Sequence, residues 1–261
     1  MGVLLSERPL ARTYSHPSVA DSHEIVEQYR EAMRYNPDEG STAIAEQLDV
    51  PRGRVRPWLK GRKPDAVHAI ETATEHGWLA DTWTPVARSL ARLVALVYAT
   101  GAINRRTNRV SWTPSQAVTG DRIKVDLDTV GVGWTTAHND SERRTTELRP
   151  QDSASVIGRA LAAADAPVGP HHETVSTLPT WLSTAPPAVR AGFAEWYARE
   201  RATSYPGKAT RRMQVDRPTT FYDAVATLVR DVTDAPVTVS GSGVTISAAA
   251  ARALGLSPSS G

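Results

Sequence analysis

Apolar residues recur at helical spacing through the first third of the chain. Between residues 21 and 36 the apolar positions are Ile25, Val26, Tyr29 and Met33, with Asp21 or Ser22 placed to cap the N-terminus and Asn36-Pro37 after the last turn. Residues three and four apart share one face of a helix. This pattern therefore predicts a first, scaffolding helix.

Two shorter amphipathic segments follow, from residues 41 to 48 and from Pro51 to Leu59, with a tight corner between them. Their apolar positions are Ile44, Ala45, Leu48, Val50, Val55 and Trp58. A small residue such as Ala45 lets two helices cross closely, and the larger apolar side chains fill the wedge between them. The spacing predicts a helix-turn-helix, whose second helix is the one that reads DNA.

The second of these segments is strongly basic. From residue 21 to 49 the chain has eight acidic residues against two arginines, whereas from 50 to 64 it has six basic residues and no acidic one. Such a face can reach base edges and phosphates together. We therefore expect DNA contacts from Arg52, Arg54, Arg56, Lys60, Arg62 and Lys63. Pro57 departs from the usual pattern, because it removes one backbone hydrogen bond from this helix. The alternative to DNA binding is a solvated basic helix on a small helical domain.

A further helix is predicted from Pro64 to Gly77 and would close this small domain. It carries His68 and His76, which are eight residues apart and have no acidic companions on the same face. We interpret both as structural or exposed rather than as metal ligands.

The remaining two thirds of the chain alternate between helical and strand-like patterns. A helix that starts near Pro85 and ends at Thr100-Gly101 is apolar almost all round, as is typical of a central helix. Strand-like stretches at 103–114 and 122–134 follow it, and a helix begins near residue 152. A similar order restarts at Pro186, which indicates an internal repeat. The predicted fold class is α+β, with an all-α domain ahead of a two-unit αββα domain.

Composition narrows the remaining classes of protein. The chain has 261 residues, of which 40% are hydrophobic and 22% charged, and it has no cysteine. These values are typical of a globular protein with room for two modest domains. Without cysteine there is no disulfide framework and no thiolate metal site, so we expect a cytoplasmic location. No run of eighteen apolar residues occurs, so no membrane partner is expected.

The central helix sequence LARLVALVYATGAI resembles the signature helix of the LAGLIDADG homing endonucleases, and AGFAEWYARERA resembles a second copy about 100 residues later. The resemblance covers residues 86 to 256. It implies two pseudo-symmetric units that pack through their signature helices. It also implies that each helix delivers one acid to a divalent metal at its C-terminal end, and that the strands form a saddle over DNA.

Carried over to this chain, the acid before the signature glycine falls at Thr100 in the first copy and at Glu200 in the second, where Arg201 replaces the glycine. A hydroxyl cannot supply the anionic oxygen that holds a cation such as Mg²⁺. The resemblance therefore implies a relative that binds DNA without cutting it, with no catalytic residue, no metal and no cofactor. The small interface residue falls at Ala95 and at Glu195, and a glutamate fits close helix packing poorly.

The strand-like segments carry basic residues in both units. They are Arg105, Arg106, Arg109, Arg122 and Lys124 in the first, and Lys208, Arg211, Arg212 and Arg217 in the second. Arg122 and Lys124 alternate with Ile123 and Val125, as in a half-buried strand. Such strands can follow a groove and contact phosphates. The alternative is a solvated sheet face in an unrelated α+β domain.

Other candidate chemistry is weaker. His171-His172-Glu173 follows a proline, and adjacent histidines point apart, so we interpret it as a surface loop. Gly241-Ser242-Gly243 lies between alternating valines and predicts a hairpin turn rather than a phosphate loop.

These features predict a site-specific double-stranded DNA-binding protein, a transcriptional regulator acting as a monomer or a homodimer. It is similar to the bacterial sporulation-type regulators that pair a decayed LAGLIDADG domain with a helix-turn-helix, in the reverse order. The expected divisions are a flexible arm (1–20), the helix-turn-helix domain (21–80), the degenerate domain (81–256) and a flexible tail (257–261). One alternative is an active Mg²⁺-dependent endonuclease that uses Glu200 with Asp126 or Asp128. Another is a regulator whose C-terminal domain senses a ligand or a protein partner.

Overall fold

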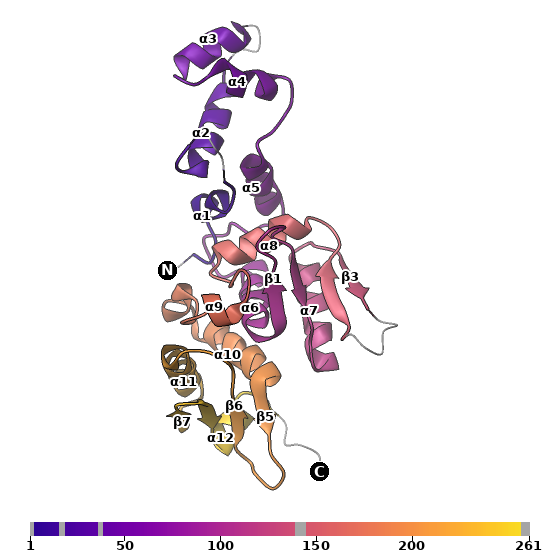
Figure 1. The fold of residues 1–261 in the computed structure, drawn as a ribbon, viewed down its shortest axis with the longest axis vertical. Coiled ribbons are helices and arrows are strands. Elements are labelled where there is room, and N and C mark those ends of the chain that lie inside the picture. Colours follow the sequence, from indigo (N-terminus) through magenta and orange to yellow (C-terminus); the bar gives the residue numbers. More distant parts are fainter. Residues whose placement is uncertain (1–2, 16–18, 36–38, 139–144, 257–261) are drawn as a thin grey trace. The chain divides into compact units, whose positions relative to one another are not determined.

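The computed structural model describes residues 3–15, 19–35, 39–138 and 145–256. The chain divides into two compact units, Leu5–Leu79 and Ala80–Gly261, the latter joined by the N-terminal residues up to Leu4. The first unit is helical, and the second combines helices with two antiparallel sheets (Figure 1). The α+β class is therefore confirmed. Over the described ranges, no helix has both the length and the apolar character needed to cross a membrane. The expected tail at 257–261 lies outside the described residues.

The described part of the Leu5–Leu79 unit forms five helices. They are α1 (Glu7–Arg12), α2 (Ser22–Ala32), α3 (Gly40–Gln47), α4 (Arg52–Leu59) and α5 (Asp65–Glu75). The apolar stripes that predicted the last four of these helices are the faces they bury. Ile25, Ile44, Val55 and Ile70 are each no more than 2% exposed. These side chains form the core of the unit.

The expectation of a flexible arm over residues 1–20 is wrong for the described residues of that segment. Helix α1 packs against α2 and α5, and Leu10 and Ala11 are fully buried there. A six-residue helix is unstable alone in water. Burying a leucine contributes about 1.5–3 kcal/mol, which offsets the ordering of this short segment.

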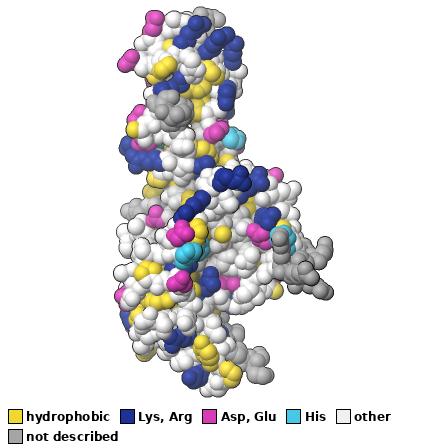
Figure 2. Space-filling model, in the orientation of Figure 1, with side chains coloured by type: hydrophobic (Ala, Val, Ile, Leu, Met, Phe, Trp, Pro, Cys, Tyr) yellow, Lys and Arg dark blue, Asp and Glu magenta, His cyan; other side chains and the backbone are white. Residues whose placement is uncertain are grey.

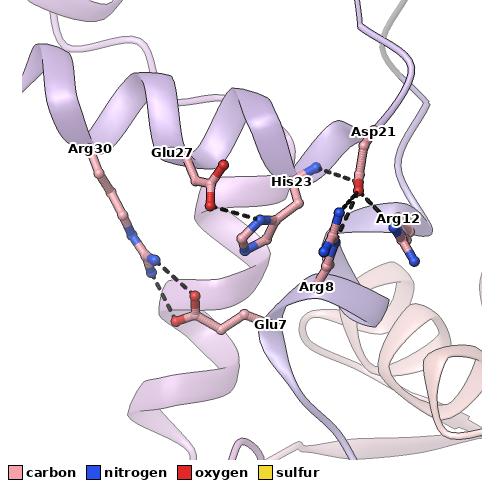
Figure 3. A network of polar contacts seen from close by, with 7 residues as sticks. All are labelled: Glu7, Arg8, Arg12, Asp21, His23, Glu27 and Arg30. Atoms are coloured by element: carbon pink, nitrogen blue, oxygen red, sulfur yellow. Dashed lines mark hydrogen bonds and ion pairs between the residues drawn. The ribbon is translucent and has the colours of Figure 1, made fainter.

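A polar network joins α1 to α2 (Figure 3). Asp21 caps α2 by accepting a main-chain hydrogen bond at 3.1 Å, and its other oxygen accepts from Arg8 and Arg12 at 2.8–3.1 Å. Glu7 forms a two-point ion pair with Arg30 at 2.8 and 2.9 Å. The hydrogen bond from Arg12 holds the pKa of Asp21 well below its usual range, and the bond from Arg30 lowers the pKa of Glu7.

The larger unit contains two halves with the same order of elements (Figure 1). The first half is α6 (Pro85–Thr100), β1 (Gly101–Ile103), β2 (Val110–Trp112), α7 (Ala117–Thr129), β3 (Trp134–Ala137), β4 (Glu147–Pro150) and α8 (Ala154–Ala163). The second is α10 (Pro187–Arg201), β5 (Ala202–Ser204), β6 (Arg211–Met213), α11 (Thr219–Thr233), β7 (Val237–Ser240), β8 (Gly243–Ile246) and α12 (Ala248–Ala253). Between them lie α9 (His171–Thr174) and the short 3-10 helix η2 (Thr180–Ser183).

Each half contains one four-stranded antiparallel sheet, and the strand orders correspond. They are β1-β2-β4-β3 and β5-β6-β8-β7. The hairpin predicted around Gly241-Ser242-Gly243 is confirmed, since Ser240 pairs with Gly243 where β7 turns into β8. Each half thus runs αββαββα, which is longer than the αββα order expected.

The difference from the expected order arises at residues 122–134, where the strand prediction is wrong. Residues 117–129 form helix α7, which buries Ile123 and Leu127 at i and i+4 while Val125 is 51% exposed. Asp126, fully buried on the same face, receives hydrogen bonds from Arg92 of α6 at 2.6–3.1 Å. The alternation of charged and apolar residues fitted a strand, but burial follows the helical period.

Helices α6 and α10 pack against each other along their lengths. Helix α6 is buried almost all round, as its composition predicted. Ala95 is fully buried, but Glu195 does not occupy the close approach expected for it. It accepts a hydrogen bond from Arg199 of its own helix at 3.0 Å. The small residue of α10 that faces α6 is Gly192, where an added Cβ would lie 4.0 Å from Cγ of Arg92.

Candidate nucleic-acid interfaces

The basic side chains of the smaller unit gather over α4 and the turn after it (Figure 2). Arg52, Arg56, Lys60 and Arg62 are exposed. Arg52 Nε donates to Ser41 Oγ at 3.2 Å. Over the described ranges, the side chains of Arg56, Lys60 and Arg62 have no hydrogen-bonding or ion-pair partner. Three cations on one short segment are therefore available to an external anion.

The other two cations of the predicted set have different roles. Arg54 is half-buried and donates to Oε1 of Gln28 on α2 at 2.7 Å. Lys63 forms an ion pair with Glu71 of α5 at 2.7 Å. Arg54 thus connects α4 to α2, and Lys63 connects the turn after α4 to α5. The expectation that all six residues contact DNA stays a prediction.

The presentation of α4 follows from its packing on α3 and α2. The corner after α3 has Asp49 at a φ of +52°, and the Val50 N–H closes the helix end on the Ala45 carbonyl at 3.0 Å. Trp58 packs edge-on against Tyr29 of α2, with ring centroids 5.7 Å apart. Pro57 does not end the helix, which continues to Leu59. The buried apolar side of α4 therefore fixes the helix in place, and its opposite side is exposed.

In the larger unit, two adjoining hollows lie on the open side of the first sheet. One, of about 520 Å³, is lined by the basic loop between β1 and β2. The other, of about 560 Å³, is lined by Thr100, Glu200 and Arg201 at the ends of α6 and α10. Ala102 and Ser111 line both hollows, so they form the floor of one continuous groove.

Thr100 and Glu200, the residues at the ends of the two signature-like helices, line the same hollow. The Thr100 hydroxyl donates to the Thr113 carbonyl, and Oε2 of Glu200 accepts from the Ser115 N–H at 2.9 Å. Oε1 of Glu200 is buried without a hydrogen-bond partner among the described residues. Within the described part of the chain, no group of three or more histidine, aspartate or glutamate side chains is placed to hold a metal.

The loop between β1 and β2 supplies the arginines of the groove. Asn104 Oδ1 accepts the N–H groups of Arg106 and Thr107 at 2.9 and 3.0 Å, which tightens the turn. Arg105 is ion-paired with Glu173 at 2.9 Å. In the described structure, Arg106 and Arg109 have no ion-pair partner. These residues were predicted on strands but lie in or beside the loop.

The second half offers fewer outward cations than expected. Arg212 lies on the open side of its sheet, in register with Thr203 and Thr245, and donates to Ser242 Oγ at 2.6 Å. Arg211 precedes it on the same strand and therefore points to the opposite side. Lys208 is exposed in the loop between β5 and β6.

Two further residues of the predicted basic saddle lie on a helix. Arg122 lies on α7, with its guanidinium 5.5 Å from the ring centroid of Trp196. Lys124, on the same helix, forms an ion pair with Asp121 at 3.1 Å and lies 5.1 Å from the ring of Trp134. We expected both residues in the saddle only because this segment was predicted to be a strand.

Other residues singled out from the sequence have different surroundings in the tertiary structure from those expected. Asp126, considered as a substitute metal ligand, is fully buried and bonded to Arg92. Asp128 accepts a hydrogen bond from the Trp134 ring N–H at 3.2 Å. His171 is half-buried at the start of α9 rather than in a surface loop. Arg217, near it, follows β6 and is also half-buried.

Neither family models nor curated proteins give a match to this chain.

Proposed function

We propose that the protein is a sequence-specific double-stranded DNA-binding protein, a transcriptional regulator that binds DNA through the α3–α4 helix pair. The observation that carries the proposal is the set of unpaired, exposed cations on α4 and the turn after it, Arg56, Lys60 and Arg62. These cations lie on a helix whose other side is anchored by Val55 and Trp58. A rigid helix with outward cations matches the way helix-turn-helix proteins enter the major groove.

A second DNA contact is proposed on the larger unit, as a degenerate LAGLIDADG-like domain. Two halves of matching element order and the packing of α6 on α10 support this relationship. The groove edged by Arg106 and Arg109 supplies cations next to the ends of those two helices. Two tethered modules raise each other's effective concentration, so a monomer can bind a long asymmetric site.

The proposed protein binds DNA without cutting it. Thr100 stands where the signature helix requires an acid, and its hydroxyl is engaged with a main-chain carbonyl. The substitute acids considered from the sequence do not replace it, since Asp126 is bonded to Arg92 in the core.

The test is salt-dependent binding of the full chain to selected DNA fragments. Arg56→Gln with Lys60→Gln is expected to lower the slope of log affinity against log salt by about 2, because each lost phosphate contact removes about 0.9. Arg106→Gln with Arg109→Gln should give a similar change if the larger unit also contacts DNA. Arg34→Gln with Arg252→Gln is the matched control, since both residues are exposed, neither lies on α4, and neither lines the two hollows of the groove.

Three results would contradict parts of the proposal. Absence of DNA binding by the wild-type chain would refute it as a whole. Unchanged binding by the Arg106 and Arg109 variant would leave the larger unit as a ligand or partner domain. Defined strand breaks in the presence of Mg²⁺ would show that the protein is an endonuclease.

A further inference from the structure

A cluster of basic groups in the larger unit is built from three segments that are distant in the sequence. His171 is the first residue of α9, Arg201 is the last residue of α10, and Arg217 follows β6. All three side chains are half-buried. We call these three residues the basic cluster. Arg217 was among the basic residues expected from the sequence to contact DNA, whereas His171 and Arg201 were not.

The hydrogen-bonding capacity of the basic cluster is largely unused. Nε2 of His171 and Nε of Arg201 are buried and have no hydrogen-bond partner among the described residues. Arg217 donates to the main-chain carbonyl of its own neighbour, Asp216. In the described ranges, none of the three residues forms an ion pair with an acidic side chain. A buried donor without an acceptor costs free energy, so such groups commonly mark the place of an external acceptor.

The positive charges of the cluster act on one another. Burial, and after it the charges of Arg217 and Arg201, lower the pKa of His171 to about 4. Burial and the charge of Arg201 also lower the pKa of Arg217. Like charges repel each other, and an anion bound between them would add attractions that offset this repulsion.

One residue of the cluster, Arg201, faces the groove described above. It lines the hollow of about 560 Å³ together with Thr100 and Ser115. Pro170, which directly precedes His171, lines the adjoining hollow. A ligand in the groove can therefore contact the cluster through Arg201.

We propose that His171, Arg201 and Arg217 bind a phosphate group, which is either a backbone phosphate of bound DNA or a free phosphate ion. Guanidinium groups match the oxygens of a phosphate in pairs, and two of them with an imidazole supply donors from three directions. The DNA form of this inference rests on the proposed function, whereas the free-phosphate form does not.

The experiment has two arms, both on the full chain. In the first, inorganic phosphate replaces chloride at constant ionic strength, and the melting temperature is measured. At about ten times its dissociation constant, phosphate should raise the melting temperature of the wild-type protein by roughly 3–6 °C. Arg201→Gln with Arg217→Gln should abolish this rise, whereas Arg252→Gln, on an exposed position of α12, should retain it.

In the second arm, the same variants are titrated with duplex DNA. A fall of about 0.9 in the salt slope for the double variant, but not for Arg252→Gln, identifies a backbone phosphate as the ligand, because the cluster binds one phosphate. A phosphate-dependent rise in melting temperature with unchanged DNA binding identifies a free phosphate ion. If the wild-type chain binds no DNA but the first arm succeeds, the proposed function fails and the phosphate site stands.

The inference is overturned if the double variant matches the wild type in both arms. The double variant should still fold, because removing two cations that repel each other should not lower the melting temperature measured in chloride. This measurement distinguishes loss of phosphate binding from loss of folding. Arg201→Lys provides a further check, since it keeps the charge but loses the paired geometry and should weaken the phosphate effect without abolishing it.

Discussion

Removal of the charge of Asp126 is the sharpest test of how the larger unit is held together. Asp126 has no exposed surface, and its two oxygens accept hydrogen bonds from Arg92 at 2.6–3.1 Å. Breaking a buried ion pair by removing one partner costs about 3–5 kcal/mol. Arg92 is 25% exposed and can be partly hydrated, so we expect Asp126→Asn to cost about 3 kcal/mol, at the lower end.

Differential scanning calorimetry of the full chain can measure this loss. For a unit of roughly 180 residues, each kcal/mol shifts the melting temperature by about 2–4 °C, so a fall of about 6–12 °C is expected. Asp121→Asn is the matched control on the same helix. Its carboxylate is exposed and pairs only with Lys124, so its loss should cost no more than about 0.5 kcal/mol.

Two results would refute this reasoning. One is an equal loss in Asp126→Asn and Asp121→Asn. The other is a further large loss in the paired change of Arg92→Met with Asp126→Leu, because replacing both charges with apolar groups should recover much of the stability.

Two further perturbations test other parts of the fold. Gly158→Ala on α8 should lower the free energy of unfolding by about 1–3 kcal/mol, because the new Cβ would lie 1.9 Å from the Asn108 carbonyl oxygen. Gly120→Ala is the control, since its Cβ has room and the change should be neutral or stabilising. Equal effects of the two variants in chemical unfolding would contradict the packing described. The smaller unit should lose stability as the pH falls below about 4.5. The pKa values of Glu7 and Asp21 are lowered in the folded state, so the unfolded chain binds protons at a higher pH than the folded chain and is favoured by acid. Urea unfolding at pH 7 and pH 3 measures this loss, and an unchanged pH slope in Asp21→Asn would show that the network in Figure 3 does not carry it.

The sequence by itself determined the elements whose apolar period is unambiguous. Helices α2 and α4 were predicted because their apolar residues recur at helical spacing and leave one face for water. Helix α6 was predicted as a central helix because it is apolar almost all round. The same pattern placed the basic residues of α4 on its outer side. The order of helical and strand-like patterns along the chain also predicted a mixed α+β protein. These are local properties, and the periodicity of one segment is enough to show them.

Only the tertiary structure decided what the ambiguous segments and the individual charges do. Residues 117–129 alternate like a strand, and their helical state depends on burying Ile123, Asp126 and Leu127 against the rest of the unit. Whether a cation is free depends on partners far along the chain, as with Arg54 and Gln28. The basic cluster brings together α9, the end of α10 and the segment after β6. No local pattern reports such proximity, because it is created by packing between elements that are distant in sequence.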